Sequence, residues 1–223
     1  METLKERLED FAKQIKENTK EEELQKLFSE LAPAFLYGGY IQVRNDYKVY
    51  IRTVEFYFHS EKTNGVHDPI VYHRNTRYIE GDVPFFPLMS IHAHASGFDI
   101  TFENKEKQYR ASALIRAYEI WDIARKNYIV YDKTIQKFRE FKENDNVING
   151  QSTYLYDFLN GFNKESVRWV NEKTNQTIVA KQTHRKGVFE STNPNKYEPK
   201  EVDGQKVKDN RQWSFTRQEN IRQ

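Results

Sequence analysis

One carboxylate lies in an otherwise apolar and aromatic stretch, VEFYF, at residues 54–58. The alternation of side chains from Lys48 onward predicts a strand with two largely apolar faces, which is typical of a central strand. Glu55 is then half-buried, where a carboxylate needs a cation or hydrogen-bond donors to stay charged. Arg116, near the end of a later predicted strand, is the partner that we expect. The residues alone leave two interpretations open, a general base and a structural ion pair.

Histidines form the second candidate group. Five of the six lie between positions 59 and 94, namely His59, His67, His73, His92 and His94. His92 and His94 are two residues apart on a predicted strand, so their side chains point the same way, as two metal ligands would. His67, Asp99 or Glu55 could supply a third ligand. Histidines hydrogen-bonded in a polar groove explain the pattern as well, and we therefore predict neither a metal site nor a cofactor.

The order of several motifs resembles that of the methylpurine (alkyladenine, 3-methyladenine) DNA glycosylase family. LAPAFLYGGYIQV looks like the family's helix and first strand, and VEFYF looks like its V-E-x-E-A-Y strand. GVHDP lies where the family has an Ala-His pair, and HRN is similar to its T-P-R-N. SGFDITFEN and ASALIRAYE resemble Y-G-M-x-x-x-x-N and A-x-V-L-L-R-A-x-E-P. The resemblance covers about residues 31–118 and is weaker after that.

The resemblance implies roles for individual residues. Glu55 would be the general base that activates a water, with Arg116 holding it ionised. The base-binding residues would be Tyr57, His67, His92 and His94. The DNA-binding residues would be Arg74, Asn75, Ser96, Gly97, Glu103 and Arg217, the last from the late motif RQWSFTRQ.

The departures from the family pattern concern the opening of the duplex. Ser96 stands where the family has a tyrosine that fills the hole left by a flipped base, and Ser96 cannot wedge in this way. His92 or His94 replaces the stacking tyrosines, and Glu103 replaces the asparagine that gates the pocket. Without a wedge, the free-energy cost of unstacking a base is poorly offset, and this favours an unpaired or single-stranded substrate.

Three functions remain open at this point. The first is hydrolysis of the N-glycosidic bond of a damaged or modified purine, in which Glu55 deprotonates a water and its charge stabilises an oxocarbenium-like state. The second is a non-catalytic nucleic-acid-binding relative, in which Glu55 and Arg116 form a structural pair. The third is a metal-dependent hydrolase that uses the cluster from His59 to His94.

The helices and strands predicted to carry these residues indicate a single α+β domain over residues 1–223. We expect an N-terminal helical segment over 1–30, with a capping box from Thr19 to Glu22, and an interruption of the helix at Pro33. A hairpin turns near Asn45-Asp46, strands follow around 88–104 and 109–120, and helices are predicted over 132–142 and 152–160. Residues 60–87 and 174–210 read as long polar loops. The family resemblance implies that the sheet is curved and mainly antiparallel, with flanking helices.

The predicted strand from Lys48 has two sets of side chains, and aromatic residues over 35–58 are expected to form core. One face would hold Val49, Ile51, Thr53, Glu55 and Tyr57, and the other Tyr50, Arg52, Val54, Phe56 and Phe58.

Composition bounds the partners. The 223 residues carry a net charge of +2 and no cysteine, and 30% are charged. No apolar run approaches the roughly 20 residues of a membrane span, and the start METLKERLED has no apolar core of a signal peptide. Residues 164–223 hold thirteen bases and eight acids, which suits a polyanion as well as a solvated surface. We therefore expect a monomeric cytoplasmic protein that binds DNA and no membrane.

Overall fold

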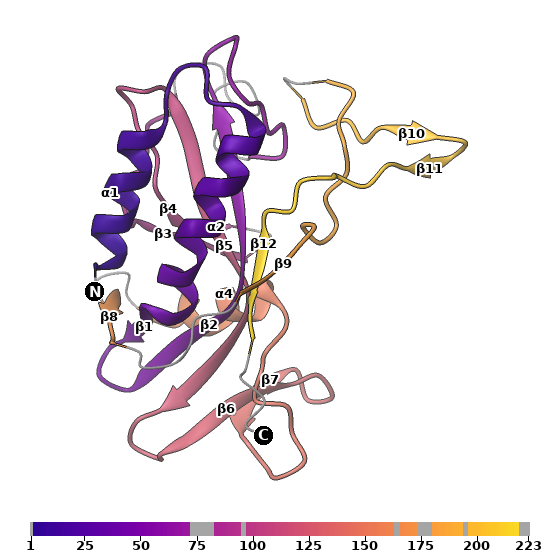
Figure 1. Ribbon diagram of the computed structural model, residues 1–223. Coiled ribbons are helices and arrows are strands. Elements are labelled where there is room, and N and C mark those ends of the chain that lie inside the picture. Colours follow the sequence, from indigo (N-terminus) through magenta and orange to yellow (C-terminus); the bar gives the residue numbers. More distant parts are fainter. Residues whose placement is uncertain are drawn as a thin grey trace.

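Two N-terminal helices lie side by side on one face of a curled sheet (Figure 1). The computed structural model describes residues 2–71, 83–94, 97–162, 166–173, 180–193 and 196–218. Helix α1 (Leu4–Gln14) begins with a capping box, in which the Glu6 amide donates to the Thr3 hydroxyl and the Thr3 amide donates to the Glu6 carboxylate. Leu4, Leu8 and Phe11 form its buried stripe.

Helix α2 (Glu21–Tyr37) differs from the prediction at two points. Its first turn is closed by Glu23, which accepts from the Lys20 amide at 2.9 Å, whereas Thr19 accepts from the Lys16 amide in the preceding turn. The predicted capping box from Thr19 to Glu22 is therefore wrong by one residue. Pro33 lies inside the helix and does not interrupt it. Leu31, before the proline, and Phe35, after it, are both buried, so packing against the core stabilises the helix across the proline.

The sheet has the order β3-β4-β5-β2-β1-β8, and every pair is antiparallel. Strand β12 also pairs with β2 and β9, and β6 pairs with β5 and β7. The ten strands of the described sheet are β1 (Gly39–Val43), β2 (Tyr47–Ser60), β3 (Ile91–His94), β4 (Gly97–Thr101), β5 (Tyr109–Asp122), β6 (Asn127–Asp132), β7 (Lys137–Glu140), β8 (Val167–Asn171), β9 (Ala180–Thr183) and β12 (Ser214–Arg217). The described chain is thus a single α+β domain with a curled antiparallel sheet and three helices.

Paired irregularities divide the long central strands β2 and β5. Ile51 pairs with Tyr118 and Val54 with Ile115, so each strand has two residues between these pairs. The register shifts twice within this stretch, on either side of Thr53. Val49 and Ile51 before the shift, and Val54 and Phe56 after it, all belong to the core that contains the helices. The predicted strict alternation is therefore wrong, because a bulge changes which residues share a face.

The opposite face, turned away from α1 and α2, is called the outer face here. On β2 it carries Lys48, Tyr50, Arg52, Glu55 and Tyr57, since these residues alternate with the core positions on either side of the bulge. Glu55 and Tyr57 thus share a face with Tyr50 and Arg52, contrary to the prediction.

An aromatic core fills the space between the inner face and the two helices. The Phe28 ring stacks on Phe56 at 4.6 Å and meets Trp213 edge-on at 5.1 Å, and Phe35 also packs against Phe56. Phe35, Tyr37, Phe56 and Phe58 are core, as predicted for residues 35–58, whereas Tyr50 lies on the outer face.

Later elements correct two further predictions. Residues 132–142 contain strand β7, which pairs with β6 in a hairpin, and not a helix. The predicted loop over 174–210 contains β9 and a small hairpin, β10 (Glu201–Val202) with β11 (Gln205–Lys206), which projects from the body (Figure 1). Helix α4 (Ser152–Asn160) is confirmed and packs against β4 and β5.

Candidate functional site

Glu55 lies in the middle of β2 on the outer face and is 1% exposed. Its Oε2 accepts from Arg116 Nε at 2.6 Å and from the Tyr57 hydroxyl at 3.0 Å. Its Oε1 accepts from the Lys186 amide at 2.7 Å. A carboxylate has about four acceptor positions, so three protein donors leave one, on Oε1. The predicted partnership of Glu55 with Arg116 is confirmed as a direct contact.

Arg116 is held in place from three directions. Its Nη2 donates to the Tyr57 hydroxyl at 3.4 Å and to the Lys186 carbonyl at 3.2 Å, in addition to the bond to Glu55. Burial opposes its charge, but Tyr57 and Glu55 outweigh that effect and raise the pKa of Arg116. Burial, and then the charge of Glu55, raise the pKa of Tyr57, which therefore stays a hydroxyl that donates. Glu55, Tyr57 and Arg116 are thus each hydrogen-bonded to the other two.

A turn of main chain covers this group. Lys186 contributes both its amide and its carbonyl to it, and Gly187 follows with a φ of +74°. Arg185 anchors the turn beneath: it donates to Asp209 at 2.6 Å and to Asp68, and its guanidinium lies 4.7 Å from the centre of the Tyr57 ring. No local sequence pattern points to Arg185, because its partners lie 117 and 24 residues away.

The two strand histidines lie on the same side of the sheet as Glu55. His92 pairs with Asp99, Asp99 with Leu114, and Leu114 with Glu55, so these residues form a line across β3, β4, β5 and β2. His94 Nε2 is 3.2 Å from Asp99 Oδ1, and the His92 ring packs 4.2 Å from that of Phe86.

The described ranges contain no group of three or more His, Cys, Asp or Glu side chains placed to hold a metal ion. His73 lies outside the described residues. The described residues therefore offer no set of ligands for the metal ion of the third function, a metal-dependent hydrolase.

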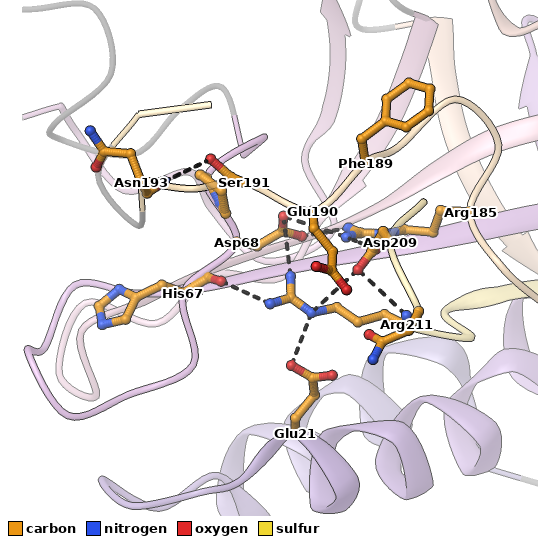
Figure 2. A pocket seen from close by; sticks show the side chains of 12 residues that line it. Glu21, His67, Asp68, Arg185, Phe189, Glu190, Ser191, Asn193, Asp209 and Arg211 are labelled. Atoms are coloured by element: carbon orange, nitrogen blue, oxygen red, sulfur yellow. Dashed lines mark hydrogen bonds and ion pairs between the residues drawn. The ribbon is translucent and has the colours of Figure 1, made fainter. Parts of the chain in front are cut away.

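His67 lines a separate polar hollow of about 330 Å³, and Glu55 is not among the residues that line it (Figure 2). Arg211 is central in this hollow and contacts Glu21 of α2, the His67 carbonyl and Asp68. Burial opposes the charge of Asp68, but Arg185 and Arg211 outweigh it and hold the pKa of Asp68 below its usual range. The ring of His67 points away from Arg211 in this view.

The expected DNA-binding residues are spread over the molecule. The Glu103 carboxylate is buried, and it accepts from Arg110 at 3.1 Å and from the Phe86 amide at 2.8 Å. Gly97 faces α4, where an added Cβ would meet Ser152. Arg217, at the end of β12, has its guanidinium 4.7 Å from the centre of the Tyr37 ring. Arg74, Asn75 and Ser96 lie outside the described residues.

A second hollow, of about 400 Å³, opens on the outer face beyond the bulge. It is lined by Lys48, Tyr50, Arg52, Glu119, Trp121, Tyr128 and Arg217. Of these only Arg217 was a predicted site residue. The others escaped notice because strict alternation placed Tyr50 and Arg52 with core residues on β2, and because β6 was not predicted.

No family model, curated protein or solved structure matches the chain. No helix in the described part of the chain is long and apolar enough to span a membrane.

Proposed function

We propose that this chain binds nucleic acid through the outer face of its sheet, and that Glu55 and Arg116 form a structural ion pair. One contrast on this face supports the proposal. Glu55 is sealed by protein donors, whereas Lys48 and Arg217 line a hollow that is open to solvent, in which Arg52 is ion-paired with Glu119. Phosphates bind where cations are accessible, and a general base acts only where a water and a substrate reach it.

The arrangement around Glu55 suits a structural role. Catalysis of the glycosylase type needs Glu55 in a groove with a water between it and Arg116. Here the guanidinium contacts the carboxylate directly, and neither polar hollow described above is lined by Glu55. A buried carboxylate with a cation and two further donors is compensated well enough to serve as a structural group.

The first experiment measures binding of fluorescein-labelled DNA by anisotropy over a range of salt concentrations. We expect affinity to fall as salt rises, since each neutralised phosphate releases counterions. Glu55→Gln, studied at a temperature where circular dichroism shows it folded, should bind like the native protein. Absence of binding at low salt would overturn the proposal.

A second candidate, hydrolysis of the N-glycosidic bond of a damaged or modified purine in DNA, is favoured by one observation. The family resemblance assigns Glu55, Tyr57 and Arg116 to one site, and these three side chains lie together, with Glu55 and Arg116 in direct contact and not bridged by a water. A single turn of main chain at Lys186 contacts both members of the pair. Movement of this turn would expose a carboxylate and an arginine on the outer face.

The two candidates are separated by excision of hypoxanthine and 3-methyladenine from single- and double-stranded DNA in the presence of a chelator. We expect none. Excision by the native protein that persists with chelator and disappears in Glu55→Gln would instead establish the glycosylase and make Glu55 its base. Loss of excision on chelation would point to a metal.

A further inference from the structure

Aromatic rings line the hollow on the outer face. The rings of Trp121 and Tyr128 lie 4.9 Å apart at 73°, and that of Tyr50 lies 5.4 Å from Tyr40. Tyr50, Trp121 and Tyr128 are partly exposed, so they keep ring surface in contact with solvent. Base–aromatic stacking needs this kind of accessible ring face.

The rings belong to a continuous row across five strands. Tyr128 pairs with Trp121, Trp121 with Lys48, Lys48 with Gln42, and Gln42 with Arg168. Directly paired residues of an antiparallel sheet share a face, and neighbouring strands lie about 4.8 Å apart. The row therefore runs roughly 19 Å across the sheet, from two rings at one end to a cation at the other.

Positive charge accompanies the rings. Three cations, Lys48, Arg52 and Arg217, line the hollow with one carboxylate, Glu119, which Arg52 contacts. Glu172 reaches Lys48 from outside the lining at 3.5 Å, in an ion pair with both partners partly exposed to solvent. Such pairs are weak, and the lining keeps an excess of positive charge that complements a phosphate backbone.

We propose that this row and hollow bind single-stranded DNA, with bases stacked on Trp121 and Tyr50 and phosphates beside Lys48 and Arg217. The inference rests on the proposed function and names its substrate class and its site. Bases within a duplex are stacked on each other and cannot reach these rings, whereas unpaired bases expose their faces to them. Rings and cations around one hollow therefore favour the single strand over the duplex.

The experiment measures anisotropy of fluorescein-labelled oligothymidylate and of a mixed-sequence duplex, with native protein, Trp121→Ala and Trp121→Phe. We expect the single strand to bind more tightly than the duplex. Trp121→Ala should weaken single-strand binding by roughly tenfold, and Trp121→Phe, which retains a ring, by much less.

A second pair of variants tests the charges. Lys48→Ala should lower the slope of log affinity against log salt by about one phosphate contact. Lys137→Ala, which removes an exposed lysine on β7 away from the hollow, should leave that slope unchanged.

The outcomes distinguish the two proposals. Native protein that binds neither oligonucleotide overturns the proposed function and this inference together. Binding that is unaffected by Trp121→Ala and Lys48→Ala, with both variants folded, overturns only the location. Preference for the duplex, or for a single-stranded RNA of the same sequence, overturns the substrate class.

Discussion

A buried ion pair stabilises a fold only as long as both partners are present. Glu55 is 1% exposed and Arg116 compensates its charge, so removal of the arginine leaves a buried carboxylate without its cation. The loss of one partner is therefore far more damaging than the net contribution of the pair. Tyr57 and the Lys186 amide would remain as donors and would limit the damage.

We expect Arg116→Ala to lower the free energy of unfolding by about 3 kcal/mol, at the lower end for buried pairs because its side chain is about a quarter exposed. Urea denaturation measures this change. Arg125→Ala is the matched control, since it removes an arginine whose ion pairs with Asp122 and Glu140 are formed by a mostly exposed side chain, and it should change stability little. Equal effects of the two substitutions would contradict the structural role of Arg116.

At the scale of elements, the paired irregularity of β2 and β5 sets the outer face. The register shift places Arg52 next to Glu119 and Arg116 next to Glu55, two ion pairs on the same surface. The sequence predicted both strands, because alternation and apolar content are local properties. The Glu55–Arg116 contact was expected from an acid and a base on two strands predicted to be neighbours. The bulge was missed because Tyr50 and Tyr57 make both faces of the predicted strand look apolar and hide the change from odd to even core positions between Ile51 and Val54.

The hairpin of β3 and β4 depends on a close approach to helix α4 at Gly97. Its φ is +139°, and a Cβ there would collide with the side chain of Ser152. We expect Gly97→Ala to destabilise the protein by about 1–3 kcal/mol through overpacking and backbone strain. Thermal and urea unfolding measure it.

Gly150→Ala provides the comparison for that substitution, because nothing lies within 4 Å of a Cβ at Gly150. It should change stability by less than about 0.5 kcal/mol. If Gly97→Ala is tolerated equally well, the contact between β4 and α4 is looser than described.

At the scale of the whole molecule, buried charges join segments that are far apart in the sequence. Arg185, which follows β9, contacts Asp68 from the loop after β2 and Asp209 from the segment before β12. Arg211 adds Glu21 of α2 to the same cluster. Ion pairs of this kind determine which loops cover the outer face, and local sequence patterns do not predict such pairs. The contact between the predicted loops over 60–87 and 174–210 therefore could not be predicted from the sequence.

The lowered pKa of Asp68 predicts a dependence of stability on pH. A carboxyl whose pKa is lower in the folded state stabilises the fold above its unfolded pKa of about 3.9, and this contribution is lost as pH falls through the folded pKa. We expect Asp68→Asn to be less stable than the native protein at pH 7 and to lose less stability on acidification below about pH 4. Denaturation at several pH values measures both.

Asp203→Asn serves as the control, because Asp203 is exposed in the turn between β10 and β11 and asparagine accepts its φ of 52°. Its pH profile should match that of the native protein. A profile of Asp68→Asn that also matches would show that Asp68 is no more strongly held than a surface carboxylate.

The turn that covers Glu55 has a consequence for sequence change over time. It contacts the buried pair through the amide and carbonyl of Lys186, and every residue except proline can supply both groups. The side chain at 186 can therefore drift without exposing the carboxylate beneath it, whereas a replacement of Glu55, Tyr57 or Arg116 alters the contacts directly. We therefore expect purifying selection on Glu55, Tyr57 and Arg116 but not on the side chain of Lys186.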